Sequence, residues 1–385
     1  MQRDLYEPDH EAFREVVQAY VKREVTPSQQ RWEQEHSVDR QAWLAAGKQA
    51  IIGLPIPERF GGAGTDDFRY RCVVMEELAR VCANSLSLGF GLQDDIAAPY
   101  LIDLGTEEQK ARWLSPMATG EWIGAIAMTE PAAGSDLQGI RTAAVRDGDA
   151  WVLNGAKTFI TNGINADLVI VAARTDPDAG SRGLSLLVVE RGMPGFSRGR
   201  KLDKIGLHAQ DTAELFFDEV QVPAANLLGR EGGGFVHLME RLPRERMSIA
   251  MLALTSVRAA LDWTVDYTTQ RTAFGQPLAA FQNTAFELAS AVTETDVLEA
   301  YLDKAVLALN AGTLTAVDAA KAKLWATEVQ RRLLDRCLQL FGGYGYMAEY
   351  PIARAYADAR VQTIYGGTSE IMKTIIARDL TGLRA

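Results

Sequence analysis

The chain has 385 residues, which is too long for one ordinary hydrophobic core and suits two or three packed domains. Hydrophobic residues make up 47% and charged residues 23%, as in water-soluble globular proteins, and no apolar run approaches the roughly 18–20 residues of a membrane-spanning helix. The formal net charge of -10 argues against a nucleic-acid partner, because neutralising many phosphates requires a basic surface.

The first 121 residues have the pattern of helices. Residues 13–25 and 68–83 repeat apolar side chains every three or four positions, and Thr106 and Gln109 have the spacing of a capping box. The first thirty residues are charged and helix-patterned, so we expect no secretory signal and a cytoplasmic location. The three cysteines and four histidines show no metal-ligand spacing, so we expect no metal site. We therefore predict an N-terminal α-helical domain over residues 1–121.

Residues 122–230 have the composition of β-strands. Four short runs are rich in Val, Ile, Leu, Phe and Thr and are bounded by Gly, Asn, Asp and Pro: "AWVLNGAKTFITNG", "ADLVIVAAR", "GLSLLVVE" and "AELFFDEVQVP". Helical signals are nearly absent there. We predict a middle β-domain, a barrel or a sandwich, over these residues.

Residues 231–385 return to helical periodicity. After the turn-rich "GREGGG", long periodic segments cover residues 235–271, 282–311, 316–341 and 369–380. Four such segments are enough for a C-terminal four-helix bundle. The whole chain is thus predicted to be an α+β protein in the order helices, β-domain, helices.

Two stretches of the β-domain are candidates for ligand contact. "AMTEPAAGSD" (residues 127–136) joins a strand to a Pro/Gly turn, where small residues and two hydroxyls would let a flat polar ligand approach. "KTFITNG" (157–163) places an aromatic ring and a hydroxyl two residues apart, which puts Phe159 and Thr161 on one face of a regular strand. An ordinary β-loop and a half-buried strand explain the same residues locally. Neither stretch is a GxGxxG nucleotide motif.

Three stretches of the helical region are further candidates. "QRTAFGQPLAAFQ" (270–282) places Arg271 at a helix end, where it either complements the helix dipole or binds a phosphate. "QLFGGYGYMAEYP" (339–351) ends a helix in two glycines, which form a C-cap or admit a cofactor to the backbone. "IYGGTSE" (364–370) makes a tight turn before a helix, yet no side chain in its Tyr-Gly-Gly-Thr core can accept a proton at neutral pH.

In this order and spacing, these stretches resemble the acyl-CoA dehydrogenase family over residues 13–380. "KIGLHAQDTAELFF", "LPRERMSIA" and the segment ending in "IYGGTSEIM" are most similar to the long-chain members. The resemblance implies FAD held between the β-domain and the C-terminal bundle. It also implies a homotetramer, in which a neighbouring subunit supplies part of each FAD site.

The resemblance also implies residue roles. FAD would contact Met128, and its isoalloxazine ring would be surrounded by Thr129, Gly134, Ser135, Phe159 and Thr161. Its diphosphate and adenosine portions would contact, partly across the subunit interface, Arg271, Phe274, Gln282, Gln339 and Gly343. Thr368 and Glu370 would close over the cofactor. The acyl-CoA substrate would contact Ser135, Arg246, Tyr365 and Gly366.

The catalytic base is the point at which the chain departs from many family members. They carry a glutamate at the position of Gly366, so either this enzyme is inactive or its base lies elsewhere. In isovaleryl- and long-chain-type members the base comes from the first helix of the C-terminal domain, and the matching residue here, 28 positions before Ala273, is Glu245. Pro243 is expected to bend that helix toward the cleft. Pairing of Glu245 with Arg244 or Arg246, or a solvated position, is the structural alternative.

The activity implied is FAD-dependent α,β-dehydrogenation of an acyl-CoA thioester to the trans-2-enoyl-CoA, with medium-to-long or branched acyl chains. Glu245 would remove the α-proton, the β-hydrogen would leave as hydride to flavin N5, and the Gly366 amide would hold the thioester oxygen. An electron-transfer flavoprotein would reoxidise FAD. Three alternatives stay open on this fold: an acyl-CoA oxidase or flavin monooxygenase, a nucleic-acid-associated relative, and a silent subunit of a heteromeric dehydrogenase.

Overall fold

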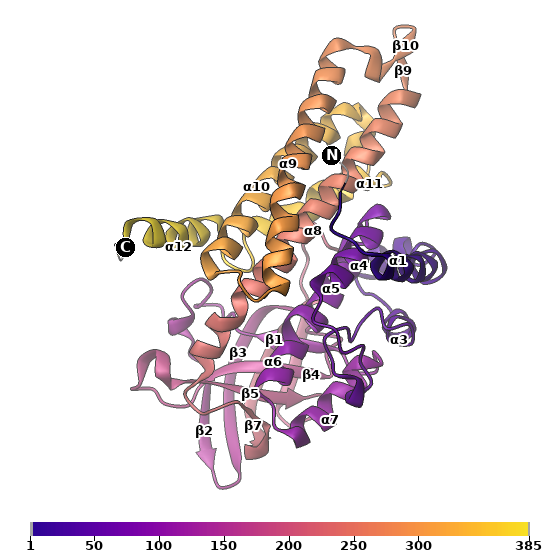
Figure 1. Cartoon of the computed structure of the whole chain (residues 1–385). Helices are drawn as coiled ribbons and strands as arrows, with labels where there is room; N and C mark the ends of the chain where they lie inside the picture. The colour runs from indigo at the N-terminus through magenta and orange to yellow at the C-terminus, as the bar shows by residue number, and fades with distance from the viewer. Residues whose placement is uncertain (1–2, 384–385) are drawn as a thin grey trace.

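The computed structural model describes residues 3–383. Helices come first along the chain, a β-sheet follows, and a second group of helices ends it, so the predicted α+β order is confirmed. Figure 1 shows the sheet at one end of the molecule and the long C-terminal helices extending away from it. The domain boundaries at 121/122 and 230/231 stay predictions.

The N-terminal region consists of short helices linked by turns. Thr106 and Gln109 form the predicted capping box, since the Thr106 hydroxyl accepts from the Gln109 amide (3.3 Å) and the Gln109 side chain accepts from the Thr106 amide (2.9 Å). Two π-helical turns, Val21–Val25 and Leu92–Ala97, extend neighbouring helices. The α-helices are α1 Pro8–Tyr20, α2 Gln29–Glu35, α3 Arg40–Gly47, α4 Phe68–Arg80, α5 Asn84–Gly91, α6 Ala98–Leu104 and α7 Glu107–Ala118.

The middle region is one continuous eight-stranded sheet. Its strands are β1 Gly124–Ala127, β2 Ala143–Asp147, β3 Ala150–Thr161, β4 Leu168–Arg174, β5 Leu184–Glu190, β6 Phe196–Lys201, β7 Thr212–Pro223 and β8 Leu227–Leu228. The order is β6-β7-β3-β2-β4-β5-β8, with β1 parallel beside β4. β3, β4, β5 and β7 coincide with the four predicted runs. The apolar strands β4 and β5 are buried along nearly their whole length, as expected for strands covered on both faces.

The C-terminal region contains the four predicted helices, each ending within one residue of its expected bounds, and a further short helix, α11. A two-stranded hairpin, which we call the tip, joins the first two long helices. The elements are α8 Gly234–Gln270, β9 Thr272–Ala273, β10 Gln276–Pro277, α9 Gln282–Asn310, α10 Ala316–Leu340, α11 Pro351–Ala359 and α12 Ser369–Thr381.

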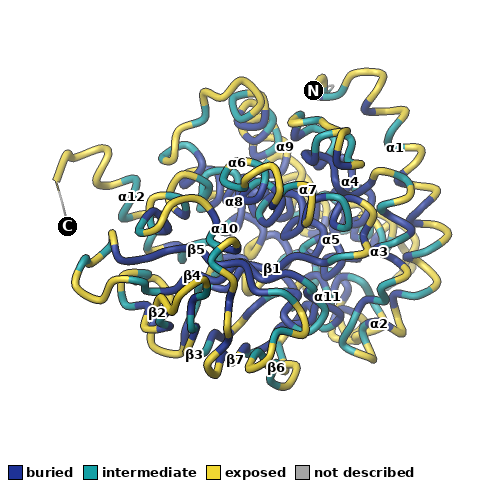
Figure 2. Tube along the Cα trace, turned by 90° about the horizontal axis from the view of Figure 1, so that it is seen from below, coloured by how far each residue is buried: buried dark blue, intermediate teal, exposed yellow. Residues whose placement is uncertain are grey.

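The first and last helical regions share one hydrophobic core. Phe68, Cys72 and Met75 of α4 belong to the same buried cluster as Met251 and Leu254 of α8. Figure 2 shows these inner helices and the central strands buried, whereas the end of α12 is exposed and stands away from the body. The N-terminal helices therefore position residues against the first half of α8, where Glu245 lies.

Candidate active site

Glu245 is buried on α8, with 4% of its surface exposed. Its Oε1 accepts a hydrogen bond from the Tyr100 hydroxyl (3.3 Å). Burial raises the pKa of Glu245 to about 7, although the Tyr100 hydrogen bond and the nearby Arg246 and Arg241 cations oppose that rise. A buried carboxylate with such a pKa is suited to exchanging a proton near neutral pH.

The structural alternative for Glu245 does not hold. Among residues 3–383 no Lys, Arg or His nitrogen lies within ion-pairing distance of its carboxylate, and the side chain is not on a solvated face. The Arg244 guanidinium lies instead over the Phe68 ring, 5.7 Å from its centroid. Pro243 lies within α8, and the bend expected there stays a prediction.

The turn that contains Gly366 packs against the same stretch of α8. Gly366 and Gly367 both have left-handed backbone angles (φ 64° and 98°). A Cβ atom added to Gly366 would lie 2.2 Å from Cδ1 of Ile249, which is one helical turn beyond Glu245. The turn and Glu245 therefore pack on the same stretch of α8, and a side chain at Gly366 would require the end of the Ile249 side chain to move.

Gly366→Ala should lower the free energy of unfolding by about 1–3 kcal/mol, chiefly because the left-handed backbone angle disfavours a side chain, and further because the end of the Ile249 side chain must move. Thermal or denaturant unfolding measures the loss. Gly312→Ala is the matched control, since Gly312 has nearly the same angle (φ 66°) but open space around it. An equal loss in the two variants would show that the Ile249 contact is unimportant.

Lys323 contacts this turn, and it was not among the predicted site residues. It is fully buried on α10, and its Nζ donates a hydrogen bond to the Gly367 carbonyl (2.7 Å). Burial lowers the pKa of Lys323 to about 8, and the Arg246 cation adds to that effect. The sequence does carry a signal for this residue, because Lys323 interrupts a run of small core residues in α10, but spacing alone does not indicate its partner.

Arg246 and Tyr365 complete the predicted substrate contacts on this side. Arg246 is buried, its Nε has no hydrogen-bond partner among residues 3–383, and burial lowers its pKa although Glu245 opposes this. Tyr365 is half-buried, and burial raises the pKa of its hydroxyl. A buried donor without a partner is costly, so the Arg246 Nε is available to a ligand group.

The loop at residues 128–136 is held by a buried ion pair in the β-domain. Lys157 Nζ donates to Glu130 Oε1 (2.8 Å) and to the Met128 carbonyl (3.1 Å). The Glu130 carboxylate also accepts from the amides of Arg141 (2.7 Å) and Thr142 (2.9 Å). These bonds fix the backbone that presents Met128 and Thr129, both half-buried. Further along the loop, the predicted residues Gly134 and Ser135 are exposed.

Phe159 departs from a regular strand. The pairing of β3 with β7 shifts register between Lys157 and Ile160, and Phe159 has φ 59°, which is rare for an aromatic residue. The alternation by which Phe159 and Thr161 were expected to share a face is therefore interrupted by a bulge. Phe159 remains 68% exposed and Thr161 half-buried, so both reach the surface of the sheet.

The predicted diphosphate and adenosine contacts form a separate group at the tip. Phe274 is 97% exposed in the β9–β10 hairpin, and the Arg271 guanidinium lies 5.7 Å from the centroid of the Tyr344 ring. Gln282, Gln339 and Gly343 are exposed near the same ends of α9 and α10. Figure 1 shows the tip at the opposite end of the helices from the sheet. Within one chain, these residues are therefore not next to Glu245.

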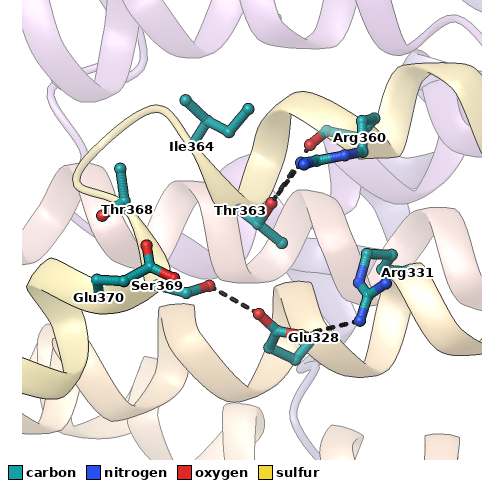
Figure 3. A pocket seen from close by; sticks show the side chains of 8 residues that line it. All are labelled: Glu328, Arg331, Arg360, Thr363, Ile364, Thr368, Ser369 and Glu370. Carbon is teal, nitrogen blue, oxygen red and sulfur yellow. Dashed lines mark hydrogen bonds and ion pairs between the residues drawn. The ribbon is translucent and has the colours of Figure 1, made fainter.

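Thr368 and Glu370 line a pocket of about 230 Å³ between α10, α12 and residues 360–364 (Figure 3). Thr368 caps α12 by accepting from the Ile371 amide (3.3 Å), and the Ser369 hydroxyl donates to Glu328 (2.7 Å). Arg331 and Arg360 add positive charge to the rim. Arg331 also pairs with Glu328 (3.5 Å), so the lining of the pocket carries charges of both signs.

The described part of the chain contains no helix long and apolar enough to cross a membrane. Within residues 3–383, no group of three or more His, Cys, Asp or Glu side chains is arranged to hold a metal ion.

Comparisons with known proteins agree with this architecture. Family models described as the N-terminal, middle and C-terminal domains of acyl-CoA dehydrogenase match residues 7–121, 125–220 and 232–381. The long-chain specific acyl-CoA dehydrogenase, mitochondrial, of Sus scrofa is 48% identical over 380 residues, which cover 98% of this chain and 88% of that protein. The isovaleryl-CoA dehydrogenase, mitochondrial, of Solanum tuberosum is 35% identical over 378 residues, covering 98% and 91%.

A solved structure extends the agreement to three dimensions. The acyl-CoA dehydrogenase from Geobacillus kaustophilus is 48% identical and superimposes with a TM-score of 0.95, covering 98% of this chain and 99% of that one. The same order of helices, sheet and helices therefore extends over nearly the full length of both chains. The chain belongs to the acyl-CoA dehydrogenase family of FAD-dependent oxidoreductases.

Proposed function

We propose that this acyl-CoA dehydrogenase forms the trans-2-enoyl-CoA with Glu245 as its catalytic base. The observation that carries the proposal is a buried carboxylate with a pKa raised to about 7, on the helix surface against which the Gly366 turn packs. Near neutral pH a substantial fraction of Glu245 is ionised and able to take the α-proton. Binding of an acyl chain would bury the site further and strengthen the basicity of the carboxylate.

The Gly366 turn would serve the same step through its backbone. With a glycine at position 366, the amide N–H is free of an adjacent side chain, and it is suited to hold the thioester oxygen as negative charge develops there. Lys323 supports the turn from behind through the Gly367 carbonyl. The Gly366 turn would thus position the thioester, and Glu245 on α8 would deprotonate it.

The residues of the β-domain fit FAD. The exposed Phe159 ring offers an apolar surface to a flat ring system, and Thr129 and Thr161 offer hydroxyl groups beside it. A Cβ on Gly134 would meet nothing within 4 Å, so the loop is open to a ligand. FAD, when bound, accepts the β-hydrogen of the substrate as a hydride. Met128 and Ser135 belong to the same loop, and Ser135 would also contact the CoA portion.

A second copy of the chain would complete the cofactor site. Phe274 lies in the tip, and Arg271, Gln282, Gln339 and Gly343 lie at the helix ends beside it, far from the sheet, so they would contact the FAD of a neighbouring subunit while Thr368 and Glu370 contact the resident one. This supports the proposed homotetramer. Sedimentation showing a monomer with full FAD content would contradict it.

The class of acyl chain and the oxidant that regenerates FAD are proposed separately from the reaction itself. The Sus scrofa relative is named for long-chain substrates and the Solanum tuberosum relative for isovaleryl-CoA, so we propose a medium-to-long or branched acyl chain. We propose an electron-transfer flavoprotein as the oxidant. Both of these relatives are described as mitochondrial, and the cytoplasmic location expected from the sequence stays a prediction.

Anaerobic titration of the purified protein with acyl-CoA thioesters of graded length and branching tests the proposal. Flavin absorbance should bleach with a medium-to-long or branched thioester, and the thioester that bleaches at the lowest concentration identifies the preferred chain. Failure of every thioester to bleach a fully FAD-loaded protein would overturn the proposed reaction. Stopped-flow mixing of the reduced protein with oxygen separates a dehydrogenase from an oxidase, since an oxidase is reoxidised rapidly.

A further inference from the structure

Tyr100 is a buried residue of the N-terminal region that contacts the proposed base. It lies on α6 with 0% of its surface exposed, and its hydroxyl is 3.3 Å from Glu245 Oε1. Within residues 3–383 this is the one hydrogen bond that the Glu245 side chain makes to another side chain. Its O–H group can donate to an ionised carboxylate, whereas the other oxygen of Glu245 keeps its lone pairs for a different partner.

The Tyr100 ring is held on its other side by a chain of charged contacts. The Arg241 guanidinium lies over the ring, 5.2 Å from its centroid. Arg241 in turn pairs with Asp103 (3.0 Å), which is one turn beyond Tyr100 on α6, and donates to the His237 carbonyl (3.3 Å). These contacts restrict the ring and aim its hydroxyl at Glu245 from a fixed direction.

Charged groups lie near Glu245 on α8 and on neighbouring helices. Arg241 and Arg246 lie on α8 itself, the exposed Asp103 of α6 pairs with Arg241 and not with Glu245, and Lys323 on α10 lies close to Arg246. Asp95, in the turn before α6, accepts from Ser248 (2.6 Å) and pairs with Arg71 (3.1 Å), so its charge is already compensated. Tyr100 is the neutral donor in this set, and its effect on Glu245 does not depend on its own ionisation.

We propose that Tyr100 is a positioning residue that orients the Glu245 carboxylate and keeps it ionised, so that the free oxygen takes the α-proton. This inference rests on the proposed role of Glu245. A hydrogen bond to the ionised form of an acid stabilises that form, so it opposes the effect of burial on the Glu245 pKa. Removing the hydroxyl should therefore leave more of the base protonated at neutral pH.

Tyr100→Phe tests this, because it removes only the hydroxyl and keeps the ring beneath Arg241. The acid limb of the pH profile for single-turnover flavin reduction should move to higher pH by about one unit. The rate should fall at and below neutral pH and be retained on the alkaline plateau, where Glu245 is ionised without help. In the holoenzyme, infrared titration of the carboxylic-acid band, with Glu245→Gln as the subtraction, should report the same upward shift.

Tyr20→Phe is the matched control. Tyr20 is also fully buried in the N-terminal helices, and its hydroxyl donates to the Ala42 carbonyl (3.0 Å), away from α8. This variant should lose some stability but keep the wild-type pH profile. If Tyr100→Phe shows the same acid limb and infrared titration as Tyr20→Phe, the inference fails. If Glu245→Gln still reduces flavin normally, the proposed function of Glu245 fails first, and the two outcomes are distinguishable.

Discussion

Glu245→Gln should slow acyl-CoA-dependent flavin reduction by about 10²- to 10⁴-fold while FAD stays bound, because a positioned base contributes that much to a proton transfer. Glutamine has nearly the shape of glutamate, and its carbonyl oxygen can still accept from Tyr100. It cannot take a proton from carbon. With glycine at position 366, the opposite side of the site has no carboxylate to replace it. Anaerobic stopped-flow measurement of flavin bleaching gives the rate.

Glu77→Gln is the control for this experiment. Glu77 is as buried as Glu245, but it lies on α4 and pairs with Arg14 (2.8 Å), so its loss should affect stability and not the rate of flavin reduction. Flavin content, measured by absorbance, must match that of the wild type in both variants. A Glu245→Gln protein that bleaches at the wild-type rate would remove this residue from the mechanism and leave the base unidentified.

The position of Glu245 was predicted from resemblance, and periodicity would not have found it. From Glu245 to Val257 every residue of α8 is buried, so this part of the helix has no solvent-facing side and no amphipathic pattern. The apolar neighbours of a glutamate in such a stretch give no sign of its role until its hydrogen-bond partner is known. The partner, Tyr100, is 145 residues away, and no local rule connects two residues at that distance.

The elements of the fold were easier to predict than their contacts. Long helices and apolar strands follow from periodicity and composition, and α8, α9, α10 and α12 appear where these signals place them. The parallel placement of β1 beside β4 and the core shared by α4 and α8 depend on packing between distant segments. The bulge at Phe159 also escaped prediction, because regular alternation gives no sign of a left-handed aromatic residue.

Lys157→Met should lower the free energy of unfolding by about 3–5 kcal/mol, the typical cost of removing one partner of a buried ion pair. Lys157 is fully buried and Glu130 nearly so, and the lysine is the cation that neutralises this carboxylate. Burial lowers the pKa of Lys157 to about 8, while Glu130 opposes this. After the substitution Glu130 keeps its two backbone donors but no opposite charge. Denaturant or thermal unfolding measures the loss.

A second variant separates the unpaired charge from the loss of packing. Glu130→Gln combined with Lys157→Met removes both charges, so it should be more stable than Lys157→Met alone. Lys110→Met is the surface control, because Lys110 pairs with the exposed Glu107 (3.3 Å) and its loss should cost less than about 1 kcal/mol. Because Lys157 also holds the Met128 carbonyl, Lys157→Met should weaken FAD binding as well. Equal stability of Lys157→Met and Lys110→Met would mean that this pair does not support the loop at residues 128–136.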